Sequence, residues 1–369
     1  MLKLAWCRTV AMFVGALLLG AHGWSSGQSQ PALEATSADD ARAWLLRIHQ
    51  AANTSSYRGT LVYSVGGSMS SSRVWHYWVA DQTWEKLESL DGRQRQIVRH
   101  NEDVHTIWPQ ARVAVIERRE ALPGWQATPQ SVDPLALEQY RLQRLGIARV
   151  AGRDADVLLL APDDNLRYAQ RLWADRLTGL MLRAEVLAAG PERRVIEAAA
   201  FSEVEIGIKP EPKRLMQVTA ATQGFRIVRP KQERVELADE GWAVDKPVKG
   251  FQLKGSVRRE LEGAQAAPAD AGAGAGANSN AGAGAGAGAS AATVPVSVTV
   301  LQAVFTDGLA HVSLFIEPFD PKRHRTEAQA SLGATSTVTL RRQDHWFTAV
   351  GDVPVHTLKL LAESLARKR

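Results

Sequence analysis

The chain has 369 residues, of which 45% are hydrophobic and 22% charged, so it is long enough for about two domains with cores of ordinary size. Its formal net charge of +5 suits an anionic partner without requiring one. The only cysteine is Cys7, which excludes disulfides, thiolate metal sites and a cysteine nucleophile from the rest of the chain.

The first 23 residues have the pattern of a secretory signal peptide. Lys3 and Arg8 form a positive start, and the apolar run Val10–Leu19 is too short for a helix that spans a bilayer. Ala21 and Gly23 then supply the small residues that a signal peptidase reads. An uncleaved membrane anchor is the alternative. Cleavage would leave a net charge near +3 (5 − 2), and export argues against nucleic acid as a partner.

The first element expected in the exported chain is a helix over about 39–53. Residues 37–40 resemble a capping box, with aspartate in place of the usual glutamate. Trp44, Leu45, Ile48 and Ala52 then recur at helical spacing, which predicts one buried face.

After this helix the apolar period changes from 3.6 to 2, which is typical of half-buried antiparallel strands. Tyr57, Leu61 and Tyr63 fall on one face of the first strand, 57–65, and Asp91-Gly92 predicts a hairpin turn further on. The other strands of this meander are expected near 73–79, 84–88, 95–100, 104–108 and 112–118. Such a meander predicts one curved sheet.

A second helix is expected to begin at Asp133, a suitable N-cap, with Pro134 in its first turn. It would end at Leu145, followed by Gly146. The strands that follow are expected at about 149–160, 167–174, 180–187 and 195–206. Residues 24–208 are therefore predicted to form a large domain, and the charged, proline-containing segment 209–241 a connector.

Residues 242–369 are predicted to form a small α+β domain. Its strands are expected at about 251–260, 296–305, 309–317, 336–342 and 346–350. The chain would end in a helix with Leu358, Leu361, Ala362 and Leu365 on one face. The Ala-Gly repeats at about 264–292 have almost no surface to bury, so we predict a flexible loop there.

The motifs that carry catalysis or phosphate binding are not found in the sequence. His100 and His105 lie five residues apart, but strand alternation is expected to put them on opposite faces, which argues against a metal site. Asp163-Asp164 follows a proline and predicts a turn rather than an acid–base pair. We therefore expect a binding protein that has no cofactor and is not an enzyme.

Aromatic side chains cluster on the early strands. They could fill the core beneath the helices, but Trp75 and Trp78 have opposite parity, so one of them could face a second apolar surface. That surface could cradle acyl chains, or the small domain could cover it. The candidates for a lipid cavity are Tyr63, Trp75, Tyr77, Trp78, Trp84 and Trp108.

Several segments, in order, resemble the RseB/MucB family of periplasmic regulators of an envelope-stress sigma factor. In the large domain they are 57–63, 72–76, 85–92, 149–152 and 167–180, and in the small domain 305–318 and 350–354. The similarity covers most of residues 40–369. The Ala-Gly run departs from the family as an insertion, and Asp352 stands where the family usually has glutamate.

The resemblance implies an α+β fold with a large curved antiparallel sheet, similar to the lipoprotein carrier LolA, plus a small C-terminal domain. It also implies binding to the periplasmic part of a transmembrane anti-sigma factor of the RseA/MucA type, which would be shielded from site-1 proteolysis. Lipopolysaccharide or lipid A would release the regulator. Candidate partner contacts within or beside the matched segments are Arg149, Arg167, Arg171, Phe305 and Phe315.

A periplasmic lipid or lipoprotein carrier is the alternative function. Since a carrier would need only the large domain, the matched small domain favours the regulator. The sequence leaves the oligomeric state open, a homo-oligomer included.

Overall fold

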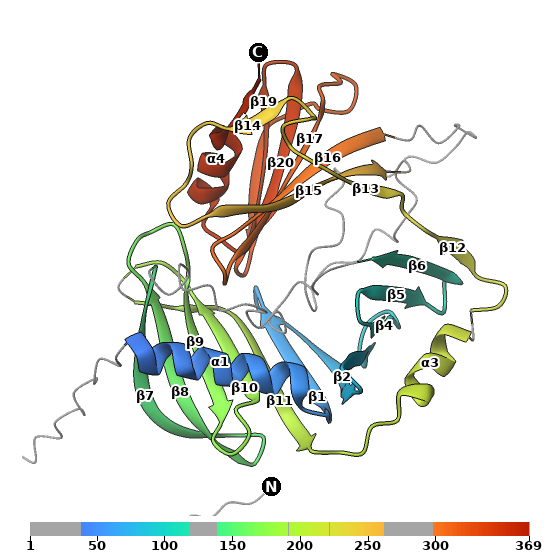
Figure 1. Cartoon of the computed structure of the whole chain (residues 1–369), viewed down its shortest axis with the longest axis vertical. Helices are drawn as coiled ribbons and strands as arrows, with labels where there is room; N and C mark the ends of the chain where they lie inside the picture. The colour runs from blue at the N-terminus through green and yellow to red at the C-terminus, as the bar shows by residue number, and fades with distance from the viewer. Residues whose placement is uncertain (1–37, 119–138, 191, 221, 262–297, 369) are drawn as a thin grey trace, which may run out of the picture. The chain divides into compact units, whose positions relative to one another are not determined.

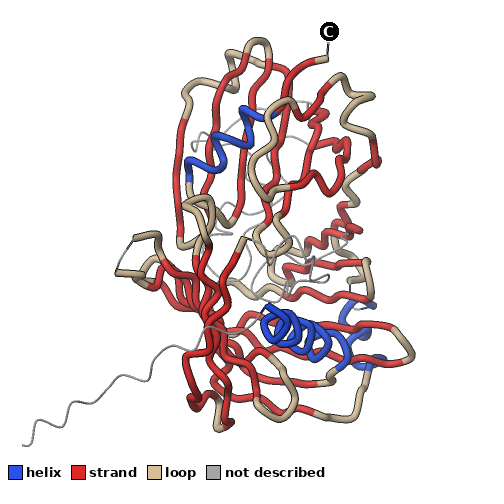
Figure 2. Tube along the Cα trace, turned by 60° about the vertical axis from the view of Figure 1, so that its left-hand side comes forward, coloured by secondary structure: helices blue, strands red, loops and turns tan. Residues whose placement is uncertain are grey.

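The computed structural model describes residues 38–118, 139–190, 192–220, 222–261 and 298–368. Strands dominate these residues and helices are few (Figure 2). The strands form a twelve-stranded sheet, a seven-stranded sheet and a two-stranded ribbon, and the described residues all belong to one compact unit (Figure 1). Within the described part of the chain, no helix is long and apolar enough to cross a membrane.

The large sheet has the order β12-β6-β5-β4-β3-β2-β1-β11-β10-β9-β8-β7, and its neighbours are antiparallel except for β12 and β6. Its first half consists of β1 Tyr57–Val65, β2 Ser68–Val79, β3 Gln82–Ser89, β4 Gln96–His100, β5 Asp103–Trp108 and β6 Val113–Arg118. Its second half consists of β7 Tyr140–Val150, β8 Arg153–Pro162, β9 Ala169–Asp175, β10 Met181–Leu187 and β11 Val195–Ile206. The predicted meander is confirmed.

Helix α1, Ala38–Thr54, agrees with the helix predicted over 39–53. Leu45 and Ile48 are almost completely buried and share a core with Leu158 and Leu160 of β8. The apolar stripe of the helix therefore packs on the sheet, and Figure 1 shows α1 lying across β8, β9 and β10.

The helix predicted up to Leu145 is wrong in its described part, because Tyr140–Val150 is strand β7. Tyr140 and Leu142 are buried while Arg141 between them is exposed, which is the alternation of a strand. Gly146 stands beside a shift of register and not at a helix end. Residues 133–138 lie outside the described residues. The strand expected at 149–160 is likewise split into β7 and β8 by a turn at residues 151–152.

The segment expected to connect the domains is made of short ordered elements. Helix α3, Pro212–Ala220, is followed by β12, Arg226–Val228, which pairs with β6 of the large sheet. Strand β13, Gln232–Val235, then pairs with β15 of the small sheet. The connector thus contributes an edge strand to each sheet.

The small sheet has the order β13-β15-β16-β17-β20-β19-β18. Its strands after β13 are β15 Gln252–Leu261, β16 Val298–Thr306, β17 His311–Pro318, β18 Ala328–Leu332, β19 Thr335–Arg342 and β20 His345–Gly351. The ribbon pairs β14, Trp242–Val244, with β21, Leu365–Arg367.

Helix α4, Val355–Ser364, closes the core of the small sheet. Leu358 and Leu361 are fully buried there, against Phe305 and Phe347 of the strands. Leu365 belongs to the same core but is the first residue of β21, so the terminal helix is shorter than predicted. The Ala-Gly run lies outside the described residues.

Candidate functional site

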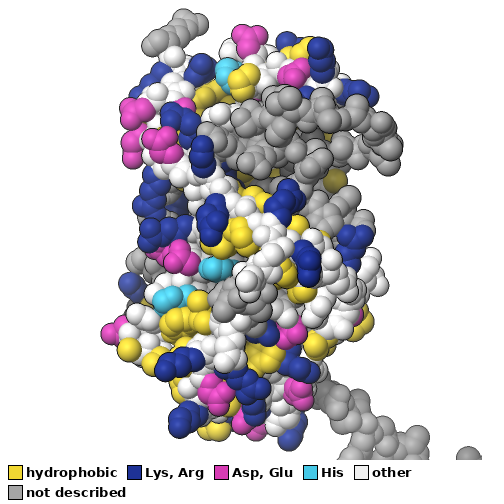
Figure 3. Space-filling model, turned by 90° about the vertical axis from the view of Figure 1, so that its right-hand side faces the viewer, with side chains coloured by type: hydrophobic (Ala, Val, Ile, Leu, Met, Phe, Trp, Pro, Cys, Tyr) yellow, Lys and Arg dark blue, Asp and Glu magenta, His cyan; other side chains and the backbone are white. Residues whose placement is uncertain are grey.

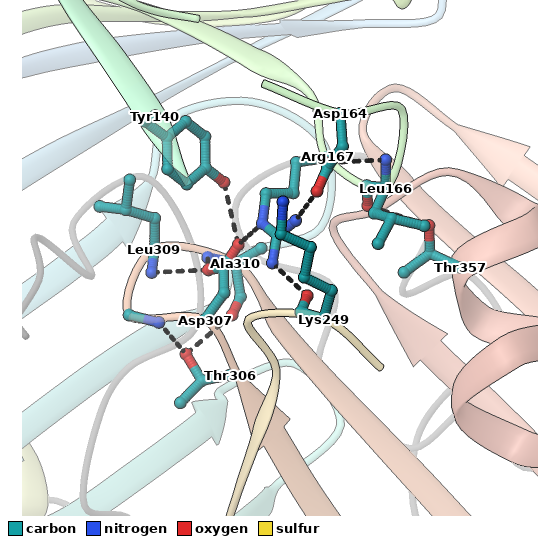
Figure 4. Close-up of polar contacts among 11 residues, drawn as sticks. Tyr140, Asp164, Leu166, Arg167, Lys249, Thr306, Asp307, Leu309, Ala310 and Thr357 are labelled. Carbon is teal, nitrogen blue, oxygen red and sulfur yellow. Dashed lines mark hydrogen bonds and ion pairs between the residues drawn. The ribbon is translucent and has the colours of Figure 1, made fainter. Parts of the chain in front are cut away.

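The most unusual feature of the described residues is a fully buried ion pair that joins the two sheets. Arg167 lies in the loop between β8 and β9 of the large sheet, and Asp307 directly follows β16 of the small sheet. Neither side chain has exposed surface, and the Arg167 Nε lies 2.5 Å from the Asp307 Oδ2. Figure 4 shows the two side chains pointing toward each other.

The turn after β16 holds Asp307 in place. The Oδ1 of Asp307 accepts hydrogen bonds from the backbone N–H groups of Leu309 and Ala310, at 2.9 and 2.7 Å. The Thr306 hydroxyl donates to the Ala310 carbonyl and accepts from the Gly308 N–H. The turn at Asp307-Gly308 therefore has a second role, because it leaves the Oδ2 of Asp307 free to face the large sheet.

The guanidinium of Arg167 uses all three of its nitrogens. Besides Asp307, it donates from Nη1 to the Asp164 Oδ2 at 2.6 Å and from Nη2 to the Lys249 carbonyl at 2.7 Å. Its carbon lies 4.7 Å from the centre of the Phe251 ring. Such full pairing is what a buried charge requires, since an unpaired one is costly.

Two neighbours complete this cluster. Tyr140 of β7 donates from its hydroxyl to the Asp307 Oδ2 at 3.1 Å. Burial raises the pKa of Tyr140 and the nearby Asp307 raises it further, so the phenol stays a donor. Gly250 lies against Arg167 with φ of +77°, and a Cβ at Gly250 would overlap the Arg167 Nη2. We give the name Arg167 cluster to Arg167, Asp307, Asp164, Tyr140 and Gly250.

Further contacts between the sheets lie outside the Arg167 cluster. The Thr357 hydroxyl of α4 donates to the Leu166 carbonyl at 2.9 Å. Arg259 of β15 pairs with Glu117 of β6 at 3.3 Å, and both side chains are largely buried. The two sheets are therefore held by directional polar contacts at separate points.

A carboxylate contact of a different kind involves Glu197 of β11. Its Oε2 accepts from the Ala334 N–H in the loop between β18 and β19, at 3.1 Å. Burial raises the pKa of Glu197, and the charge of Asp352 raises it further, against the lowering effect of hydrogen bonds from Ala334 and Tyr63. Glu197 is thus a buried acid that the fold makes harder to ionise.

The candidate cavity residues do not share one face of the large sheet. Cross-strand partners point to the same side of a sheet, so the strand register assigns each residue to a face. Tyr63, Trp78 and Trp108 lie on one face, and Trp75, Tyr77 and Trp84 lie on the other. Tyr77 is buried and the other five are half-buried. Their role in a lipid cavity stays a prediction.

The candidate partner contacts differ in how far solvent reaches them. Arg149 is exposed on β7, Phe315 is half-buried on β17, and Arg171 lies 3.2 Å from the buried Glu185. Arg167 and Phe305 are 1% and 2% exposed, so neither can touch a partner from the surface as they lie here. Their role is internal: Arg167 joins the sheets and Phe305 fills the small core.

The prediction that His100 and His105 lie on opposite faces is wrong. The two residues stand on β4 and β5, the strands of one hairpin, and His105 pairs with Val98, which shares a face with His100. His100 stacks on Trp84 with ring centres 3.6 Å apart, and burial lowers the pKa of His105. No group of three or more metal-binding side chains occurs among the described residues.

The fold and the junction define a protein of two antiparallel sheet domains joined by a buried polar cluster. The family model of the MucB/RseB N-terminal domain matches residues 40–219, and that of the MucB/RseB C-terminal domain matches residues 287–366. The sigma factor AlgU regulatory protein MucB of Pseudomonas aeruginosa is 30% identical over 341 residues, which are 90% of this chain and 93% of that protein. The chain therefore belongs to the MucB/RseB family, whose members in these comparisons are regulatory proteins and not enzymes.

Three further comparisons agree. The sigma-E factor regulatory protein RseB of Haemophilus influenzae is 29% identical over 147 residues, which are 40% of this chain and 47% of that protein. A crystal structure of MucB in complex with MucA(peri) has a TM-score of 0.60 and 27% identity, and the match covers 89% of this chain and 100% of that one. A crystal structure of MucB alone has a TM-score of 0.57 at 26% identity, with 90% and 99% covered.

Proposed function

We propose that this protein is a periplasmic regulator that binds the periplasmic part of a transmembrane anti-sigma factor and shields it from site-1 proteolysis. The observation that carries the proposal is the match along both domains to MucB as it occurs in complex with MucA(peri). A lipid carrier would need only the large domain. The presence of the small domain, and the buried polar cluster that fixes it to the large one, favours the regulator.

The reachable candidates for contact with the anti-sigma factor are Arg149, Arg171 and Phe315. The two arginines suit carboxylates, and a half-buried phenylalanine can extend its contact area on binding. A different side of the molecule, the one that includes β6 and β12, is drawn in Figure 3, where Lys and Arg side chains lie among hydrophobic ones and some acidic ones. Such a surface fits an acidic, partly apolar partner.

We further propose that lipopolysaccharide or lipid A releases the regulator under envelope stress. The thermodynamic condition is strict: a lipid dissociates the complex only if it binds the free regulator more tightly than the complexed one. Aromatic side chains on both faces of the large sheet are the candidates for contact with acyl chains.

The test is calorimetry of the exported chain with the periplasmic segment of the anti-sigma factor from the same organism, with and without lipid A. Tight binding that lipid A weakens supports the whole proposal. Binding that is indifferent to lipid supports the regulator but refutes the lipid signal. Uptake of lipid with no binding of the segment would assign the protein to the carriers. Digestion of the segment by the site-1 protease, with and without the regulator, measures the shielding directly.

Arg149→Gln gives a residue-level test of the same proposal. We expect it to weaken binding of the segment about tenfold, the effect of losing about 1.4 kcal/mol, without changing the stability of the free protein. The matched control is Arg214→Gln, because Arg214 is an exposed arginine on α3 that pairs only with the exposed Glu211 among the ion pairs found. Equal affinities of the two variants would remove Arg149 from the interface.

A further inference from the structure

The turn between β18 and β19 docks tightly against one end of the large sheet. A Cβ added at Gly333 would overlap the Val65 Cγ2 and would lie only 2.8 Å from the Glu197 Oε2. On the other side of the same contact, a Cβ added at Gly66 would lie 2.7 Å from the Leu332 Cδ1. The two sheets therefore fit together here with no room for an additional methyl group on either side.

Two consecutive residues of this turn hold one carboxylate from each sheet. The Ala334 N–H donates to the Oε2 of Glu197 on β11 at 3.1 Å. The Thr335 hydroxyl donates at 2.8 Å to the Oδ1 of Asp352, which directly follows β20. Asp352 is exposed, so protons from the solvent can reach it. The turn thus brings a carboxylate of the large sheet and a carboxylate of the small sheet to one contact.

No cation neutralises these two acids within the part of the chain that the structure describes. Neither Glu197 nor Asp352 pairs with a lysine or arginine there, and the charge of Asp352 acts directly on Glu197. The strand neighbours of Glu197 are the apolar Val65 on β1 and Val186 on β10. An ionised Glu197 therefore faces apolar side chains and a second negative charge.

Three other titratable side chains face the two carboxylates, and none of them supplies a positive charge at pH 7. Burial raises the pKa of Tyr63 and of Tyr168, so both phenols stay protonated. Burial lowers the pKa of His311, and the nearby Asp307 and Lys254 shift that pKa in opposite directions. The imidazole of His311 is therefore neutral at pH 7.

The other polar contacts between the sheets differ in this respect. Asp307 is paired with Arg167, and Glu117 is paired with Arg259. An arginine keeps its charge at every ordinary pH, so these pairs attract across the neutral range. Two carboxylates, by contrast, repel each other once both are ionised.

We propose that Glu197 and Asp352 form a proton-dependent latch between the two sheets. The latch is closed while the two carboxylates share a proton, and it loosens when both are ionised. Once it is open, the small domain is free to turn about the Arg167 cluster. The arrangement of the two domains would then follow the pH of the surrounding solution.

The direction of the pH dependence follows from the protonation of Glu197. Burial raises the pKa of Glu197 and the charge of Asp352 raises it further, so docking of the turn takes up a proton. The docked arrangement is therefore stabilised at acidic pH and loses that stabilisation as the pH rises through the raised value. Each unit by which docking raises the pKa changes the docking equilibrium about tenfold.

Energy transfer between two dyes on the exported chain tests the latch, because that chain is expected to contain no cysteine of its own. Leu177→Cys places one dye on the large sheet and Leu360→Cys places the other on α4, at positions 86% and 41% exposed. Transfer should differ between pH 5 and pH 7 and should return on reversal of the pH. The measurement needs no partner, so its outcome is independent of whether the anti-sigma segment binds.

Glu197→Gln keeps an oxygen for the Ala334 N–H but cannot ionise, so its transfer at pH 7 should stay at the value of pH 5. Asp352→Asn removes the like charge and should reduce the change with pH. The matched control is Glu203→Gln, which alters an exposed carboxylate on the same strand whose partner, Thr60, belongs to the same sheet. This control should respond to pH as the wild type does.

Gly333→Ala tests the docking of the turn by a steric route. It should give at pH 5 the transfer that the wild type shows at pH 7. Its control is Gly92→Ala, because Gly92 has a similar φ of +67° but open space around it. Circular dichroism would verify that every variant is folded. Three results would each overturn the proposal: wild-type transfer that does not change with pH, Glu197→Gln that follows pH as Glu203→Gln does, or Gly333→Ala that behaves as Gly92→Ala does.

Discussion

Replacing Arg167 with methionine should be among the most destabilising single changes available in this protein. Methionine keeps the apolar stem of the side chain, to about the position of the Arg167 Nε, but removes the guanidinium with its charge and its contact with the Phe251 ring. The carboxylate of Asp307 then stays buried with no cation beside it, and the Lys249 carbonyl loses the guanidinium as a donor. Breaking a buried pair from one side costs about 3–5 kcal/mol.

For a chain of this length each kcal/mol lowers the Tm by about 2 °C, so Arg167→Met should lower it by at least about 6 °C. The control is Arg58→Met, because Arg58 and Glu205 form an ion pair whose side chains are more than half exposed. A pair of that kind contributes about 0–1 kcal/mol. Urea unfolding followed by circular dichroism and by tryptophan fluorescence would measure both variants and show whether the two sheets unfold together.

The double variant Arg167→Met, Asp307→Asn separates the ion pair from the packing. Asparagine keeps an oxygen for the Leu309 and Ala310 N–H groups but carries no charge. Without the stranded carboxylate, the double variant should lose less stability than the sum of the two single changes. If the Arg167→Met variant is as stable as the Arg58→Met variant, this reasoning is refuted.

Two further predictions concern other residues at the contacts between the two sheets. Gly250→Ala should destabilise the protein by more than about 1 kcal/mol, because the new Cβ would overlap the Arg167 guanidinium. Gly152→Ala is the control for backbone strain alone, because Gly152 has a similar φ of +76° but open space around it. Equal losses of stability for the two variants in urea would contradict the overlap. Burial raises the pKa of Glu197 above its ordinary 4.5, so the stability it contributes is present below that pH and is lost as pH rises through the raised value. The Glu197→Gln variant should therefore lose less stability than the wild type between pH 5 and pH 7. If the urea midpoint changes by the same amount between these two pH values in both proteins, this prediction is wrong.

The elements that the sequence predicted well are those whose pattern is local. The alternation of Tyr57 and Leu61 and the stripe of Leu45 and Ile48 each bury one face, and the structure confirms strand β1 and helix α1. Strand β7 was missed because Asp133-Pro134 supplies strong helix-start chemistry just ahead of it. Its pairing with β8 is a tertiary interaction that outweighs such local preference.

The Arg167 cluster could not be predicted for a similar reason. Arg167 was one of many arginines in the sequence, and its principal partner, Asp307, is 140 residues away along the chain. Asp307 is followed by glycine, a pair that favours a turn, but a turn does not show which side chain its carboxylate will meet. The one available signal was the resemblance of residues 167–180 and 305–318 to the family. It marked both segments, but it did not show that they contact each other.

Because Arg167 joins the two domains, a variant at this position also tests whether binding of the anti-sigma segment depends on how the domains are arranged. A buried ion pair is weak evidence of net stabilisation, but it fixes the register of the groups that it joins, because every alternative arrangement leaves a charge unpaired. If the anti-sigma segment contacts both domains, Arg167→Met should weaken its binding at a temperature where the variant is still folded. If the affinity is unchanged while the Tm falls, the binding surface lies within one domain, and Arg149 and Phe315, which lie in different domains, cannot both belong to it.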